Sequence, residues 1–169
     1  MSTDLNSFDL AISAAQDSNA AWEALQELSA AVVGHKLFTV MTVDIGAGLA
    51  RRAYTSHARD YPASGTKPIH RGEWFDIVHG EKRCFVANTI ADISRVFPDF
   101  ELIASLGCGS VMNLPVVLQG ELAATINMLD AEHHYTPERV LAAEALLAIP
   151  AKLCCALAAQ FDSRTAKPD

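Results

Sequence analysis

Apolar residues recur at steps of three and four near the start of the chain, and this spacing predicts a long amphipathic helix. The helix is expected over about 6–33, where alanine, the residue with the highest helix propensity, fills many other positions. Asn19 interrupts the apolar stripe, and Gly34 supplies a stop. Because a helix of this length rarely buries its whole stripe on the core of a small domain, we expect it to pair with a second copy of the chain.

A second long helix is predicted at the other end of the chain. Thr136, Pro137 and Glu138 follow the order of an N-cap, a first helical position and an acidic first turn. The apolar spacing continues this helix over about 136–161, with a bend at Pro150, and leaves a frayed tail over 162–169.

The region between the two helices, about 36–135, reads mostly as strands and short connections. A Val- and Thr-rich run over 36–44 predicts a central strand covered on both sides, and 49–56 predicts its hairpin partner. Arg51 and Arg52 suggest that one face of this partner strand is solvated. The remaining segments are a long loop over 57–70, a short helix over 71–79, a strand over 83–87 and two helical turns over 92–105 around Pro98.

The clearest hairpin joins segments 107–119 and 121–130, and its register follows from its alternating residues. A three-residue loop, Gln119-Gly120-Glu121, sets the apolar rows of both strands on the same side of the sheet and places Asn113 opposite Asn127. The apolar rows are Met112, Leu114, Val116 and Leu118 on one strand, and Leu122, Ala124, Ile126 and Met128 on the other.

The order of these elements predicts an α+β fold in which a mainly antiparallel sheet lies between long N- and C-terminal helices. Its length of 169 residues fits a single domain over 1–169. A formal net charge of −7 argues against nucleic-acid binding and against docking on an anionic membrane. No uninterrupted apolar run is long enough to span a membrane and no secretory signal is visible, so we expect a cytoplasmic protein with reduced cysteines.

This order, read with the hairpin sequence, resembles a GAF domain. The resemblance is carried by LGCGSVMNLPV over 106–116, GELAATINML over 120–129, EHHYTPE over 132–138 and VANTIAD over 86–92. It covers roughly 7–161, is sharpest over 84–138, and implies a PAS- or profilin-like sheet between helices. GAF domains bind unrelated ligands, so the family alone does not identify a ligand or cofactor.

Two ligand classes known for GAF domains lack their motifs in this sequence. The bilin-binding version usually presents a Cys next to a His, and here no Cys adjoins a His, so a covalent bilin is not expected. The Asn-Lys-x-Asp motif typical of the cyclic-nucleotide version is also missing, and RVFPD over 95–99 lies near that place, which argues against cGMP and cAMP.

The resemblance implies a ligand pocket between one sheet face and the segments that join the middle strands. Aromatic rings would supply area and stacking, while amide and carboxylate groups would fix the orientation of a ligand. The alternatives are that the aromatic residues are plain core and that Asn113 and Asn127 bond only each other. The candidate ligand-binding residues are Trp74, Phe75, Phe97, Asp99, Phe100, Ile103, Cys108, Asn113 and Asn127.

The cysteines suggest a second hypothesis from a different class. One GAF branch, the free methionine-(R)-sulfoxide reductases, uses pocket thiols, and here Cys108 would attack the sulfoxide while Cys84 would resolve the intermediate to a disulfide. Cys108 departs from the reductase pattern, and buried cysteines are common in ordinary cores. Adjacent Cys154 and Cys155 point about 100° apart on a helix, so they cannot share a metal, and no metal site is expected.

The sequence thus favours a stand-alone, non-catalytic sensor that binds a small metabolite and acts as a homodimer through its terminal helices. Because no output domain is visible in the chain, ligand occupancy would pass to a downstream regulatory protein or through the geometry of the dimer. Segments 57–80 and 92–108 would become ordered over the ligand and shift the packing of the helices.

Overall fold

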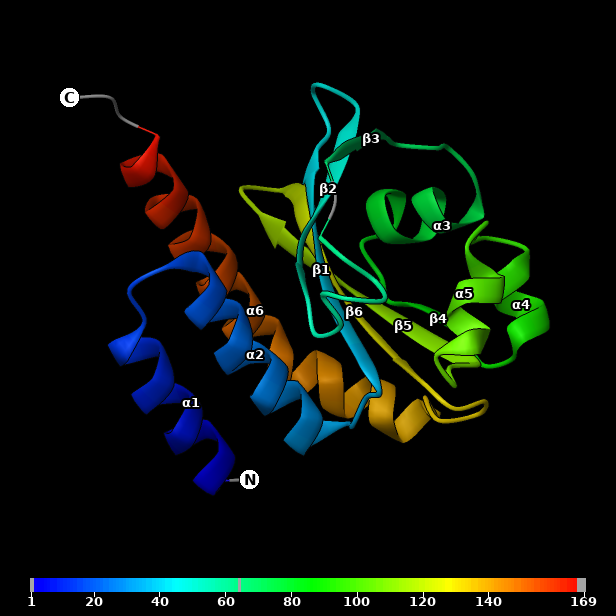
Figure 1. Ribbon diagram of the computed structural model, residues 1–169, viewed down its shortest axis with the longest axis horizontal. Coiled ribbons are helices and arrows are strands. Elements are labelled where there is room, and N and C mark those ends of the chain that lie inside the picture. The colour runs from blue at the N-terminus through cyan, green and yellow to red at the C-terminus, as the bar shows by residue number, and fades with distance from the viewer. Residues whose placement is uncertain (1, 64, 167–169) are drawn as a thin grey trace.

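The middle layer of the protein is a sheet whose neighbouring strands all run antiparallel (Figure 1). The computed structural model describes residues 2–63 and 65–166, and within them the sheet has six strands in the order β3-β2-β1-β6-β5-β4. The strands are β1 (Leu37–Asp44), β2 (Leu49–Thr55), β3 (Thr66–Pro68), β4 (Phe85–Ala87), β5 (Ser110–Leu118) and β6 (Glu121–Asp130). The α+β class and the central position of β1 are therefore confirmed.

The long helices lie on one side of the sheet: α2 (Ser18–Val32) and α6 (Pro137–Thr165) cover this face, and α1 (Ser2–Ala14) packs on α2. Figure 1 shows α2 and α6 beside the sheet, with α1 folded back along the outer side of α2. The apolar core on this side is formed by residues of α2, of α6 and of the sheet. The helices contribute Trp22, Leu25 and Leu147, and the strands contribute Phe38, Val40, Met112, Ile126 and Met128.

The N-terminal region forms two helices, where the apolar spacing predicts one. The chain leaves the helix after Ala14, and Asp17 starts a new helix by accepting a hydrogen bond from the Ala20 N–H at 2.8 Å. An Asp at this position satisfies a backbone donor that an uninterrupted helix would have paired with a carbonyl, so the cap competes with continuation. The break lies just before Asn19, where the apolar stripe is interrupted.

The opposite face of the sheet is covered by short elements. They are α3 (Glu73–Phe75), the π-helix η1 (Asp76–Gly80), α4 (Ile90–Ser94) and α5 (Phe100–Ser105), together with the segment before them. The short helix over 71–79 and the two turns around Pro98 are confirmed in outline. The predicted loop over 57–70 is partly wrong, because its residues 66–68 form β3 at the edge of the sheet.

The β5–β6 hairpin has the predicted pairing of Asn113 with Asn127, but it reaches this pairing by a different route. Leu118 pairs with Glu121 across a two-residue turn in which Gln119 and Gly120 both have positive φ, so the predicted three-residue loop is wrong. The register then shifts at a β-bulge, where Val116 pairs with Ala124 and Val117 with Leu122. From Val116 and Ala124 toward Asn113 and Asn127, the pairing is the predicted one. The bulge also places Leu122 in the apolar cluster on one face of the sheet and Ala124 in the cluster on the other face.

The C-terminal helix continues to Thr165, four residues beyond its predicted end, so residues 162–165 are helical rather than frayed. The rest of the predicted tail, from 167, lies outside the described residues. By length and composition α6 could cross a membrane, but a third of its most apolar stretch is buried within the protein. Three large apolar side chains on it remain exposed: Leu141, Ile149 and Leu153.

Candidate functional site

A cavity of about 350 Å³ lies between the second face of the sheet and the segments that cover it. This volume is at the lower end of the range of small-molecule sites. Seven of the nine predicted site residues line it: Trp74, Phe75, Phe97, Asp99, Ile103, Asn113 and Asn127. The structure thus brings together most of the predicted set, and their role in binding stays a prediction.

A chain of hydrogen bonds crosses the floor of the cavity. The Trp74 indole N–H donates to Asn113 Oδ1 at 3.0 Å, and Asn113 Nδ2 donates to Asn127 Oδ1 at 2.6 Å. Asn127 Nδ2 in turn donates to Thr39 Oγ1 at 3.1 Å. The two Asn side chains therefore do bond each other, but they also link the cover to three strands, β5, β6 and β1. Each amide nitrogen keeps a second N–H, so the chain can still donate to a ligand.

A second polar group stands at the side of the cavity. The Arg52 guanidinium lies over the Tyr61 ring, 3.8 Å from its centroid, and its Nη1 donates to the Pro62 carbonyl at 2.8 Å. The Tyr61 hydroxyl donates to Asp99 Oδ2 in a short hydrogen bond. Burial, and then the bond to Asp99, raises the pKa of Tyr61, so this phenol stays protonated and keeps donating.

Two polar atoms in residues of the cavity wall are buried and have no hydrogen-bond partner among the described residues: Arg52 Nε and Thr125 Oγ1. A buried donor without a partner costs about 1–3 kcal/mol, more when the group is charged. Arg52 is 9% exposed and Thr125 is 1% exposed. These unpaired groups mark the cavity as a place where a polar ligand atom would lower the free energy.

Sequence reasoning missed four of these residues: Thr39, Arg52, Tyr61 and Thr125. Thr39 could have been found from its place in the strand next to Asn127, with which it pairs. The expectation of a solvated strand face fits Arg51, whose side chain is 49% exposed, and is wrong for Arg52. A β-bulge is the reason: Val40 pairs with Tyr54 and Met41 with Arg52, so the skipped residue turns Arg52 into the cavity.

Phe100 and Cys108, the other two predicted site residues, do not line the cavity. Both belong to the apolar cluster around it, where Phe100 is partly buried and Cys108 is 4% exposed. The 92–105 region contributes residues 96–99 and Ile103 to the cavity wall, and Phe100 between them packs against the surrounding apolar cluster instead.

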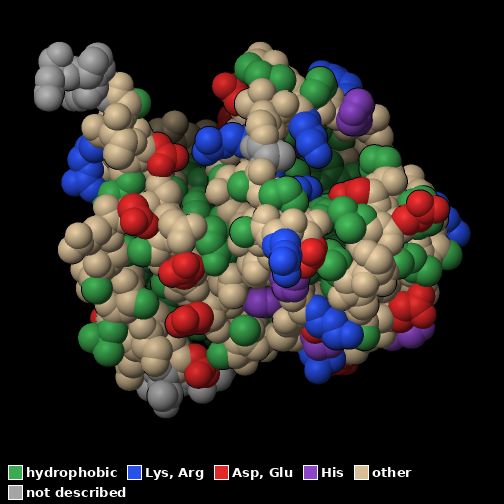
Figure 2. Space-filling model, in the orientation of Figure 1, with side chains coloured by type: hydrophobic (Ala, Val, Ile, Leu, Met, Phe, Trp, Pro, Cys, Tyr) green, Lys and Arg blue, Asp and Glu red, His purple; other side chains and the backbone are tan. Residues whose placement is uncertain are grey.

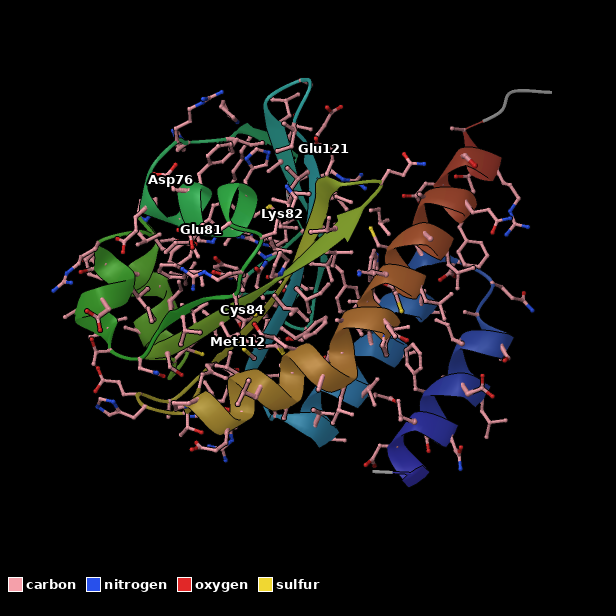
Figure 3. All side chains as sticks on the ribbon, turned by 180° about the vertical axis from the view of Figure 1, so that it is seen from behind. Asp76, Glu81, Lys82, Cys84, Met112 and Glu121 are labelled. Carbon is pink, nitrogen blue, oxygen red and sulfur yellow. The ribbon has the colours of Figure 1, made fainter. Side chains whose placement is uncertain are left out.

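The two thiols of the enzyme hypothesis lie on different faces of the sheet. Cys84 belongs to the cluster of the long helices and borders a groove with Val140 and Glu144 of α6, whereas Cys108 belongs to the cluster around the cavity. Figure 3 labels Cys84 next to Met112, and both residues belong to the core cluster that includes residues of α6. Burial raises the pKa of Cys84 to about 12 and that of Cys108 to about 11, which opposes formation of a nucleophilic thiolate.

A wider hollow of about 480 Å³ lies between α2, α6 and the four inner strands β2, β1, β6 and β5. Five alanines are among the residues that line it, and several of its polar groups pair with one another at the surface. Ser18 donates to Asp162, and Arg51 lies 3.9 Å from the same carboxylate. Among the described residues, no group of three His, Cys, Asp or Glu is placed to hold a metal ion. The cavity on the other face is therefore the best candidate site.

No protein-family model matches this chain, and no curated protein matches it. Solved structures do. The GAF domain of a phosphoenolpyruvate-protein phosphotransferase from Coxiella burnetii superimposes with a TM-score of 0.70 at 16% identity, covering 98% of this chain and 96% of its own. The corresponding Acinetobacter domain gives 0.69 at 7% identity, with coverages of 98% and 95%.

A further similar structure is the phycoerythrobilin-bound GAF domain from a cyanobacterial phytochrome. It gives a TM-score of 0.67 at 13% identity and covers 96% of this chain and 97% of its own. Likeness over nearly the full length of each chain shows that the fold is that of a GAF domain.

Proposed function

From its GAF-domain fold and its cavity we propose that this protein is a sensor or regulatory domain that binds a small molecule. The observation that carries the proposal is the cavity itself, with aromatic walls and a hydrogen-bonded floor that keeps unused donors. Apolar walls with a few convergent polar groups are typical of small-molecule sites. One similar structure holds a bilin in its GAF domain, which supports a binding role on this fold.

Binding would be coupled to the segments that cover the cavity. Trp74 from the 57–80 segment bonds Asn113 on the sheet, and Tyr61 bonds Asp99 of the 92–108 segment. A ligand that touches both segments favours their closed arrangement in proportion to its differential affinity for that arrangement. Occupancy would then reach α2 and α6 through the sheet, whose helix-side core contacts both helices.

The first test is native mass spectrometry of freshly purified protein, set against its denatured mass. A bound small molecule appears as extra mass that is lost on denaturation, and its extraction identifies the ligand. Trp74→Ala should remove the extra mass while circular dichroism stays unchanged. Phe100→Ala is the matched control, because this aromatic residue lies on the same cover without lining the cavity. Loss of folding in Trp74→Ala would instead mark Trp74 as a core residue and refute the assignment.

We also propose that the protein is a homodimer joined through its terminal helices. Leu141, Ala145, Ile149 and Leu153 follow one another at steps of four on α6 and are all exposed, with Ile149 at 77%. Neighbours at this spacing form one continuous row. Glu144 and Lys152 flank the row, so an antiparallel second copy would place opposite charges across it. A dimer covers this surface without the loss of buried contacts that membrane insertion of α6 would require.

Light scattering after size-exclusion chromatography tests the dimer at micromolar concentration. A mass near twice 18.2 kDa supports it, and a concentration-independent monomer refutes it. In this proposal the signal passes from the terminal helices to a downstream regulatory protein. Cross-linking with and without the identified ligand would test whether helix contacts change with occupancy.

A further inference from the structure

Arg52 is a buried cation without an acidic partner. Among the described residues it forms no ion pair, its Nη1 donates to a backbone carbonyl at 2.8 Å, and its Nε donates to nothing. The carboxylate of the cavity wall, Asp99, is engaged by the Tyr61 hydroxyl. Because a buried charge is costly unless it is paired, this arrangement leaves a place for an anion from outside the chain.

The local charge around the cavity has the opposite sign to that of the whole chain. Residues 49–72 contain five Lys and Arg and one Asp, although the net charge of the protein is −7. Arg52 and Lys67 of this stretch line the cavity, together with His70. Figure 2 shows Lys and Arg side chains over β2 and β3, and Asp and Glu side chains over α1 and α2. An anion approaching the cavity therefore meets the basic part of an acidic protein.

The uncharged polar groups of the cavity point to the same kind of ligand. The second N–H of Asn113, the second N–H of Asn127 and the hydroxyl of Thr125 are donors without a partner in the described residues. Such a surplus of donors matches a molecule rich in acceptor oxygens. Around them, Trp74, Phe75 and Phe97 supply flat apolar walls.

We propose that the cavity binds a small organic anion, whose acidic group pairs with Arg52 and whose flat apolar part lies among the aromatic walls. This inference rests on the proposed function and adds the chemical class of the ligand. A carboxylate or a phosphate would satisfy the guanidinium edge formed by Nε and Nη2, which can hold two oxygens side by side.

Binding of an anion to Arg52 would also change the position of the segments that cover the cavity. The guanidinium is held between the Tyr61 ring and the Pro62 carbonyl, both from the segment that follows β2. Since Nε is fully covered, an anion reaches it only when the groups around the guanidinium move, and Tyr61 and Pro62 are among these groups. Tyr61 carries the movement to Asp99 on the other cover segment, so the acidic group of the ligand would set the position of both.

Two dyes with the same rings test the charge requirement. Anilinonaphthalene sulfonate is an aromatic anion, and N-phenylnaphthylamine is the same ring system without the acidic group. We expect the wild-type protein to bind the anion at least about tenfold more tightly, as for a charge-assisted hydrogen bond. Arg52→Gln should reduce the preference to about twofold or less, because only the anion loses a charged partner.

The controls use neighbouring and conservative substitutions. Arg51→Gln changes the adjacent, exposed arginine and should leave both affinities as they are. Arg52→Lys keeps the charge and should retain part of the preference, which guards against a folding defect in Arg52→Gln. Competition by phenylacetate, phenyl phosphate and uncharged phenylacetamide then separates the two acidic groups. Displacement by either acid and not by the amide supports the proposal.

The outcomes separate this inference from the proposed function. If both dyes bind equally, or if Arg52→Gln keeps the preference, the anion assignment is overturned while a small-molecule pocket stands. If Trp74→Ala leaves the binding of both dyes unchanged, the dyes sit outside the cavity and both proposals fail. If neither dye saturates the wild-type protein, the small-molecule pocket itself is refuted.

Discussion

Substitution of Asn113 by Ala is the sharpest test of the hydrogen-bonded floor of the cavity. The substitution removes two hydrogen bonds, one from the Trp74 indole at 3.0 Å and one to Asn127 Oδ1 at 2.6 Å. Each is worth about 1 kcal/mol net, and the Asn127 oxygen, in a residue only 8% exposed, adds a desolvation cost of roughly 1 kcal/mol. We expect Asn113→Ala to lower the free energy of unfolding by about 2–4 kcal/mol.

Urea denaturation followed by circular dichroism measures this change, and a double-mutant cycle isolates the link to Trp74. Trp74→Phe keeps an aromatic ring and removes the N–H, so the cycle with Asn113→Ala should give a coupling energy of about 1 kcal/mol. Asn19→Ala is the matched control, because its side chain bonds Glu23 at the surface and should contribute below about 0.5 kcal/mol.

Two results would refute this reasoning. A loss below about 0.5 kcal/mol for Asn113→Ala would mean that water in the cavity replaces both bonds at no cost. Effects of Trp74→Phe and Asn113→Ala that add within about 0.3 kcal/mol would mean that the indole and the amide do not interact in solution.

Three further predictions concern other parts of the molecule. Gly109→Ala should destabilise the protein by about 1–3 kcal/mol in thermal unfolding, because its Cβ would lie 2.3 Å from Glu132 Cγ. The free energy of unfolding should fall as the pH rises from 9 toward 11. Burial raises the pKa of Cys84 to about 12 and that of Cys108 to about 11, from 9.0, so the unfolded chain loses these protons before the folded protein does. Unchanged stability over this range would contradict the prediction. Ile149→Glu should convert the proposed dimer to a monomer in light scattering while circular dichroism stays that of the wild type, whereas a persistent dimer would exclude the α6 row.

Much of the fold follows from alternation and spacing. Asn113 and Asn127 were placed opposite each other by the alternating apolar residues of two strands, and the structure confirms that pairing. The start of the last helix was set by Thr136, whose side chain accepts a hydrogen bond from the Arg139 N–H. These features depend on a few neighbouring residues, so a local pattern is enough to predict them.

Features that depend on competition between local and tertiary contacts were predicted less well. The N-terminal apolar spacing runs through residues 15–17, yet the cap formed by Asp17 ends the continuous helix there. The predicted three-residue hairpin loop gives the correct pairing at Asn113 for the wrong reason, since a bulge beyond a two-residue turn restores the register. Both outcomes depend on a choice between two local structures that the hydrophobic pattern alone does not decide.

The sequence by itself determined the fold class, the sheet register at the two Asn residues and most of the aromatic wall of the cavity. Only the tertiary structure decided that Arg52 is buried beside them while Arg51 is exposed. With strict alternation Arg52 would share the face of Tyr54, but the bulge in β2 turns the two side chains to opposite faces. A period of two fixes which residues share a face, and one skipped residue reverses the assignment for every residue beyond it. The candidate ligand chemistry therefore depends on a backbone irregularity that the hydrophobic pattern does not reveal.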